Sequence, residues 1–74
     1  MQIIIHRVSQ EIQIEINVWN TILEVKQQIH DKQGISINQQ ILIYGGKQLE
    51  NDQTICKYEI QQNANIYLVV CITD

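Results

Sequence analysis

The sequence predicts an α+β domain in which one α-helix crosses one face of a mixed sheet of four to five strands. Three observations support this class. Residues 21–34 have the apolar periodicity of a helix together with start and stop signals, and residues 11–17 alternate as a half-buried strand does. The most apolar segments lie at the two ends of the chain, which suits the central strands of a sheet.

Length and composition indicate one small domain, residues 1–74, with no nucleic-acid or membrane partner. A chain of this size buries only about 60–65% of its unfolded surface, so one compact core must carry the stability. The net charge is −3 and no cluster of Lys and Arg is present, which argues against nucleic-acid binding. No apolar run approaches the roughly 18 residues of a membrane helix, and no secretory signal precedes the first strand. We therefore expect a monomer in the cytoplasm, the nucleus or both.

Residues that could bind metal or catalyse a reaction are few and scattered. His6 and His30 are isolated, and Cys56 and Cys71 have no histidine partners at ligand spacing, so neither a metal site nor a cofactor is expected. Without a secretory signal, reduced thiols are favoured over a disulfide. No nucleophile has a paired base, and Cys71 has no neighbouring group that would activate its thiol. We do not expect an enzyme.

The first two strands are expected to form an antiparallel hairpin. Residues 1–7 are rich in β-branched side chains, and residues 11–17 alternate strictly between isoleucine and polar residues. The inward-facing residues of the two strands are Ile3, Ile5, Ile12, Ile14 and Ile16. The link between the strands contains no Gly, Asn or Asp. A two-residue primed turn is therefore not expected, and a four-residue loop around a type I turn fits better.

Residues 21–34, TILEVKQQIHDKQG, form the expected helix. Thr21 can cap its first turn, and Glu24 can reach back to the Thr21 amide, which is the capping-box spacing. Gly34 can adopt the left-handed conformation that ends a helix. The apolar residues that share one narrow stripe are Ile22, Val25 and Ile29. Because so short a helix is marginal alone in water, this stripe must pack on the sheet.

The second half of the chain predicts a short hairpin, a polar segment and a final strand. Residues 41–44 and 47–49 flank the Gly45-Gly46 turn, and residues 65–72 form the last strand. Trp19, which precedes the helix, is expected to pack over a loop edge rather than to act as a binding anchor. The polar segment has anchors at Ile55, Tyr58 and Ile60. The expected core consists of Ile3, Ile5, Ile14, Ile16, Ile22, Val25, Ile29, Leu42, Leu49, Ile55, Ile60, Ile66 and Leu68.

These elements and their sequences resemble the ubiquitin family. Several matching stretches follow one another along nearly the whole chain, which is more specific than any single motif. They are MQI at 1–3, DKQGI at 31–35, QQ-x-LI at 39–43, GKQLE at 46–50, YEIQ at 58–61 and LVV at 68–70. One residue is missing from the first hairpin loop. The resemblance implies the ubiquitin-like β-grasp, an α+β fold.

The resemblance also implies a binding surface on the sheet face opposite the helix. Carried over by position, its apolar residues are Val8, Ile43, Tyr67 and Val69, ringed by Gly46 and Lys47. A second family surface would map to Ile35 and to Cys71 at the end of the last strand. The strand pattern supports the first surface independently, because the alternate residues of the same strands must face the helix. The implied partners are proteins that carry helical motifs of the ubiquitin-binding type.

The chain departs from the family pattern at its C-terminal end and beside the implied surface. The family ends in a basic tail with two glycines, the last of which is joined to target lysines. Here the printed sequence ends Cys71-Ile72-Thr73-Asp74, and Ile41 stands where the family has an arginine. Family lysines used for chain building match Lys26, Lys32 and Lys47. The resemblance also implies a partly buried Lys26 ammonium that pairs with Asp52, near Asn51 or Gln40, because a buried charge needs a partner.

We therefore expect a ubiquitin-like protein–protein interaction domain that is not conjugated in this form. It would be part of a larger protein or of a multi-domain ubiquitin-like precursor. The alternative is a ubiquitin-like modifier that is conjugated through residues beyond Asp74.

Overall fold

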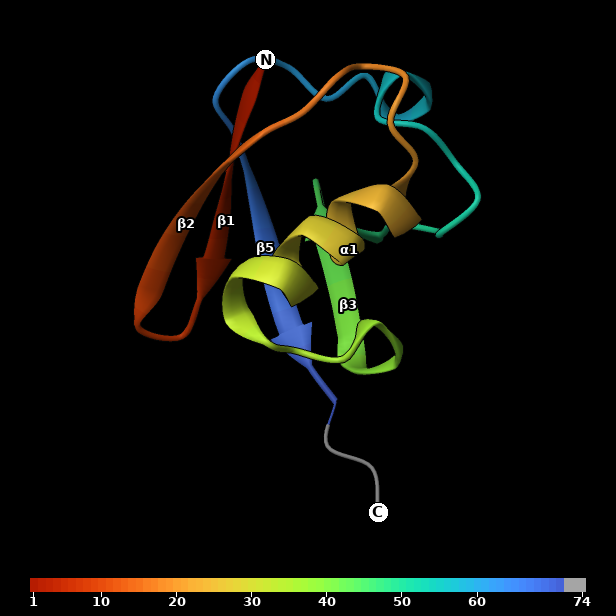
Figure 1. The fold of residues 1–74 in the computed structure, drawn as a ribbon. Helices are drawn as coiled ribbons and strands as arrows, with labels where there is room; N and C mark the ends of the chain where they lie inside the picture. Colours follow the sequence, from red (N-terminus) through yellow and green to blue (C-terminus); the bar gives the residue numbers. More distant parts are fainter. Residues whose placement is uncertain (72–74) are drawn as a thin grey trace.

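The computed structural model describes residues 1–71, which form a five-stranded mixed sheet with one α-helix across one face (Figure 1). The strands are β1 (Gln2–Arg7), β2 (Gln10–Glu15), β3 (Gln40–Tyr44), β4 (Lys47–Gln48) and β5 (Ala64–Val70). The helix α1 spans Ile22–Gln33, and two 3₁₀ helices, η1 (Ile37–Gln39) and η2 (Cys56–Tyr58), lie in the connections. The expected α+β class is confirmed, and the arrangement is that of a β-grasp.

The strand order, β2-β1-β5-β3-β4, places the first and last strands beside each other in the middle of the sheet. β1 and β5 are parallel, with pairs from Ile3↔Ala64 to His6↔Tyr67, and both outer pairings of these strands are antiparallel. Side chains alternate between the two faces along each strand, so this register decides which residues face the helix and which face away from it.

The β1–β2 hairpin closes with two residues, so the expectation of a four-residue loop is wrong. Arg7 pairs with Gln10, which leaves only Val8 and Ser9 in the turn. Neither residue has a positive φ, so the turn is not of the primed type, as expected. The register is set by the apolar pairs Ile3↔Ile14 and Ile5↔Ile12, which point all four side chains into the core.

The β3–β4 hairpin closes with Gly45 and Gly46, and here both turn residues have positive φ values of 60° and 79°. Tyr44 pairs with Lys47 across this two-residue turn. Two left-handed residues are the signature of a type I′ turn, whose twist matches that of the flanking strands. Glycine adopts this backbone without a Cβ clash, so the predicted turn is confirmed.

The helix begins and ends at the residues that the sequence predicts. The Thr21 hydroxyl accepts a hydrogen bond from the Glu24 amide at 3.2 Å, and the Thr21 amide donates to Glu24 Oε1 at 2.8 Å. Gly34 has a φ of 71°, and its amide donates to the His30 carbonyl at 2.8 Å. The capping box and the left-handed C-terminal residue are therefore both present, and the helix is fixed by local contacts.

The core lies between the helix and the inner face of the sheet. All residues expected in the core are buried, and Ile12 and Ile35 join them. Ile35 is only 9% exposed, and its carbonyl accepts a hydrogen bond from Gln40 Nε2 at 3.0 Å. The same amide nitrogen donates to the Lys26 carbonyl at 3.0 Å. The buried Gln40 side chain thus ties the middle of the helix to the segment that follows the helix.

Lys26 is buried as expected, at 6% exposure, but the expected ion pair with Asp52 is absent. Among residues 1–71, the three ion pairs involve neither Lys26 nor Asp52. Asp52 is exposed in a turn between Asn51 and Gln53, whose carbonyls accept the Leu23 and Ile22 amides. These backbone bonds hold the turn against the helix start, while the Asp52 side chain lies on the solvent side. The pairing prediction is therefore wrong.

Candidate functional site

The outer face of the sheet, opposite the helix, carries exposed apolar side chains on β5. Ile66 and Leu68 point inward and are buried, whereas Tyr67 is 56% exposed and Val69 is 45% exposed. This contrast follows from strand alternation, because successive residues point to opposite faces. Both residues are therefore available to a partner.

Strand pairing extends this surface onto β3. Ile43 lies opposite Tyr67 and Ile41 lies opposite Val69, and both isoleucines are partly exposed. Directly opposed side chains on one face have their Cβ atoms about 5 Å apart. The sheet therefore brings Ile43, Tyr67 and Val69 together as the sequence pattern predicts, and Ile41 widens the apolar surface.

The remaining residues expected at this site lie in the two hairpin turns. Val8 is fully exposed in the β1–β2 turn and lines a groove together with Val69. Gly46 and Lys47 are exposed at the β3–β4 turn. Lys47 pairs with Tyr44, which follows Ile43 in β3. Gly46 and Lys47 therefore lie at the margin of the apolar surface. We call Val8, Ile43, Tyr67 and Val69 the outer patch.

His6 belongs to this site, although the sequence indicated an isolated histidine. Its ring stacks on Tyr67 with the ring centroids 5.1 Å apart. His6 Nε2 lies 2.8 Å from Asn65 Oδ1, and because an amide oxygen only accepts, the ring nitrogen is the donor. Glu11 Oε1 lies 4.0 Å from His6 Nδ1. The sequence holds no local signal for these contacts, because they depend on the parallel register of β1 and β5.

The second surface expected from the resemblance is not supported at Ile35. That side chain is buried in the core, so its apolar area is not available to a partner. Cys71 is partly exposed just after β5, and its amide donates to the Gln39 carbonyl at 2.7 Å. Cys71 lies at the end of the last strand, as expected. Because Ile35 is buried, the two residues do not form a shared exposed surface.

Trp19 differs from expectation as well, because it is 71% exposed and does not cover the core margin. Its amide donates to Asn17 Oδ1 at 2.9 Å, which shapes the loop between β2 and α1. Val18 and Leu23 are the other exposed apolar residues in this part of the chain. They lie before and within the start of the helix, apart from the outer patch.

The described residues add three findings about other site types. Within residues 1–71, no three His, Cys, Asp or Glu side chains gather as they would around a metal ion. Cys56 and Cys71 are both free, as expected. No helix in this part of the chain has the length and apolar character needed to cross a membrane.

Comparison with known proteins agrees with the fold. The family model described as "Ubiquitin family" matches residues 4–71. The ubiquitin-like protein NEDD8 of Dictyostelium discoideum is 35% identical over 64 residues, which are 86% of this chain and 83% of that protein. The NEDD8-like protein RUB3 of Arabidopsis thaliana is 34% identical over 64 residues, 86% of this chain and 82% of its own length.

A third relative matches as one segment of a much longer protein. The ubiquitin domain-containing protein DSK2 of Saccharomyces cerevisiae is 39% identical over 71 residues, which are 93% of this chain but only 19% of that protein. The family match covers most of the chain, and two relatives match over most of their own lengths. The chain therefore belongs to the ubiquitin family.

Proposed function

We propose that this chain is a ubiquitin-like protein-interaction domain that binds its partners through the outer patch. The observation that carries the proposal is the continuous apolar surface of Ile43, Tyr67 and Val69 on the sheet face that the helix leaves uncovered. An apolar patch rimmed by polar residues usually marks an interaction site. Gly46 and Lys47 at one margin, and His6 at another, supply such a rim.

The partner that suits this surface is a short amphipathic helix. A helix presents an apolar stripe to an apolar surface and keeps its polar face in water. The interface would bury less than about 1,200 Å² in total, so binding would be weak and exchange fast. Tyr67 offers more apolar area than a histidine would, and Ile41 offers no charge to an acidic partner. A partner that is specific for this domain therefore fits the surface better than a receptor that binds ubiquitin-family proteins in general.

The relatives support the proposal that this is a domain of a larger protein or of a multi-domain precursor. The DSK2 relative shows that such a domain occurs as a small part of a long chain. The alternative, a modifier conjugated through later residues, is favoured by relatives that are nearly as short as the present sequence. The C-terminal sequence of the natural protein decides between the two.

We also place the domain inside the cell, in the cytoplasm or nucleus, as a monomer. Two free cysteines, one of them exposed, support a reducing compartment.

The interaction is tested by NMR titration of the ¹⁵N-labelled domain with an amphipathic ubiquitin-binding helix. Shifts should cluster at Ile43, Tyr67 and Val69, and Ile43→Ala should weaken binding about fivefold or more, since it truncates a side chain at the patch centre. Leu23→Ala is the matched control, because it truncates an exposed apolar residue on α1. Shifts around Leu23 and Gln27, with Ile43→Ala neutral, would show that the partner uses the helix instead.

A further inference from the structure

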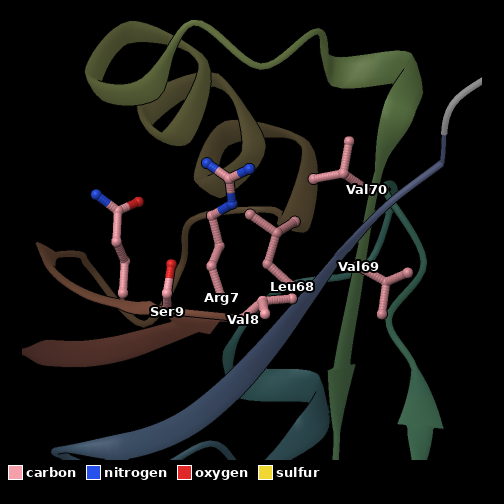
Figure 2. Close-up of a pocket in the computed structure, with 7 residues that line it drawn as sticks. Arg7, Val8, Ser9, Leu68, Val69 and Val70 are labelled. Atoms are coloured by element: carbon pink, nitrogen blue, oxygen red, sulfur yellow. The ribbon is translucent and has the colours of Figure 1, made fainter.

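A groove of about 460 Å³ opens between the β1–β2 turn and the end of β5 (Figure 2). It is lined by residues 7–10 on one side and residues 68–70 on the other. Ile43 and Tyr67 do not line it, so it lies beside the outer patch and shares only Val8 and Val69 with it. The groove is therefore a distinct feature of the surface.

One wall of the groove is a strand edge without a strand partner. β1 pairs with β5 only as far as His6↔Tyr67, whereas β3 pairs with β5 as far as Gln40↔Val70. Within the described chain, residues 68–70 therefore have register partners on β3 and none on β1. No backbone hydrogen bond outside the strand ladders joins residues 8–9 to residues 68–70 in this part of the molecule.

The direction of the backbone groups at this edge follows from a single hydrogen bond. The Cys71 amide donates to the Gln39 carbonyl at 2.7 Å. The N–H and C=O groups of Cys71 therefore face β3. In an antiparallel ladder, alternate residues bond to opposite sides. The Leu68 carbonyl and the Val70 amide therefore point away from β3 and into the groove. Unpaired groups of this kind form a template for another strand.

The groove also holds a cation. Arg7 projects to the same side of the sheet as Leu68 and Val70 in Figure 2. Among residues 1–71, none of the ion pairs uses Arg7. Leu68 is buried and Val70 is partly buried, so the guanidinium stands beside an apolar wall without a carboxylate to neutralise it. A carboxylate can meet this group with paired hydrogen bonds.

We propose that the groove binds an extended, acidic peptide segment of a partner protein by strand addition to the edge of β5. The peptide backbone pairs with the Leu68 carbonyl and the Val70 amide. An acidic side chain on the helix side of the sheet meets Arg7, and the two neighbouring side chains, on the other face, contact Val8 and Val69. The recognised pattern is therefore aliphatic–acidic–aliphatic.

The geometry favours an extended segment over a helix. An α-helix uses its backbone groups internally and offers none to a strand edge. Three residues of strand span roughly 10 Å, so the contact takes three to four peptide residues. Strand addition of this kind draws affinity from main-chain hydrogen bonds and specificity from alternate side chains. The site shares Val8 and Val69 with the outer patch but makes no use of Ile43 or Tyr67.

The probe is the peptide acetyl-Thr-Val-Asp-Val-Thr-amide, added to the ¹⁵N-labelled 74-residue chain and followed by NMR. We expect shifts at the amides of Val8, Leu68, Val69 and Val70, and slower hydrogen exchange at Val70. Arg7→Gln should weaken binding about two- to fivefold, the range of a partly exposed ion pair. Lys47→Gln is the matched control, because it removes an exposed cation outside the groove, and it should leave the affinity unchanged.

Two altered peptides separate the backbone and side-chain contributions. Replacing Asp by Lys should weaken binding by a similar factor in the wild type and have little further effect in Arg7→Gln. Methylating the peptide nitrogen that donates to the Leu68 carbonyl should abolish the Val70 protection.

No shifts in the groove at about 10 mM peptide, which would saturate even a millimolar site, would overturn the proposal. So would shifts centred on Ile43 and Tyr67 that Ile43→Ala removes. The Ile43→Ala variant should bind the Asp peptide normally while binding the helix more weakly, so the two proposals fail separately.

Discussion

Lys26 is a buried cation for which the described residues supply no carboxylate. Burial lowers the pKa of its ammonium, because the charged form loses hydration. A lowered pKa means that the folded chain binds this proton less tightly than the unfolded chain does. The charged form therefore opposes folding at neutral pH, and stability rises as the pH rises through the folded pKa. The stem of the side chain still packs in the helix stripe, which explains how the residue is tolerated.

Replacement of Lys26 tests this account directly. Lys26→Met keeps the packed stem and removes the charge, so the free energy of unfolding at pH 7 should rise by about 1 kcal/mol. Asp52→Asn should change it by less than about 0.5 kcal/mol, as is usual at an exposed site without a partner. Urea unfolding measures both values. A loss above about 2 kcal/mol in either variant would indicate that the two residues form an ion pair in solution.

Ile29 is the buried residue that best tests the helix stripe. It is fully buried in the core, so Ile29→Ala should lower the free energy of unfolding by roughly 2–5 kcal/mol. Leu23→Ala on the exposed side of the same helix should lower it by less than about 0.5 kcal/mol. Denaturant unfolding of both variants gives the comparison. Equal losses would mean that the helix packs through a different face.

At the scale of elements, the capping box makes the start of α1 sensitive to pH. The hydrogen bond from the Thr21 amide lowers the pKa of the Glu24 carboxyl below its ordinary value of 4.5. A lowered carboxyl pKa stabilises the fold above the unfolded value, and this contribution is lost as the pH falls through the folded pKa. Part of the stability that the domain loses at acidic pH therefore comes from the start of α1.

Glu24→Gln isolates that contribution, because the amide oxygen still accepts the hydrogen bond but carries no charge. The wild type should be more stable than the variant at about pH 6, and the difference should shrink as the pH falls toward about 3. Thermal unfolding across this range measures the trend. A difference that grows toward acid would mean that Glu24 has the opposite effect.

The connection between η2 and β5 contains two left-handed residues that are not glycine. Glu59 and Asn63 have φ values of 56° and 63°. A left-handed backbone costs an ordinary residue about 1–2 kcal/mol, while asparagine adopts it more readily. Asn63 is therefore well suited to its left-handed conformation, whereas Glu59 is strained in the same conformation.

Exchanging these residue types should change stability in opposite directions. Glu59→Asn should raise the free energy of unfolding by about 0.5–1 kcal/mol, and Asn63→Glu should lower it by a similar amount. Chemical denaturation of the two variants is sufficient to compare them. Destabilisation by Glu59→Asn would mean that the glutamate side chain makes a contact worth more than the strain.

For the whole molecule, the sequence predicts those features that depend on nearby residues. The helix could be placed from Thr21, Glu24 and Gly34, because its capping contacts lie within a few residues of each end. The core could be listed from periodicity, since strand and helix faces repeat at fixed intervals. The apolar side chains of the outer patch follow from the same periodicity together with the family resemblance.

The remaining features depend on contacts that periodicity does not contain. The two-residue turn at Val8 and Ser9 is imposed by cross-strand isoleucine pairs, which outweigh the weak turn preference of these residues. His6 reaches Tyr67 only because β1 and β5 pair in one particular parallel register. The missing Lys26–Asp52 ion pair depends on the direction in which one exposed turn residue points.

The adjacency of β1 and β5 has a consequence for synthesis on the ribosome. β5 is the last strand to be translated, yet it occupies the centre of the sheet between β1 and β3. Until it leaves the exit tunnel, the nascent chain can form the β1–β2 hairpin, the helix and the β3–β4 hairpin, but β5 does not yet cover their apolar faces. Apolar surface therefore stays exposed to chaperones until β5 is available, and folding of the domain waits for this strand to pair with β1.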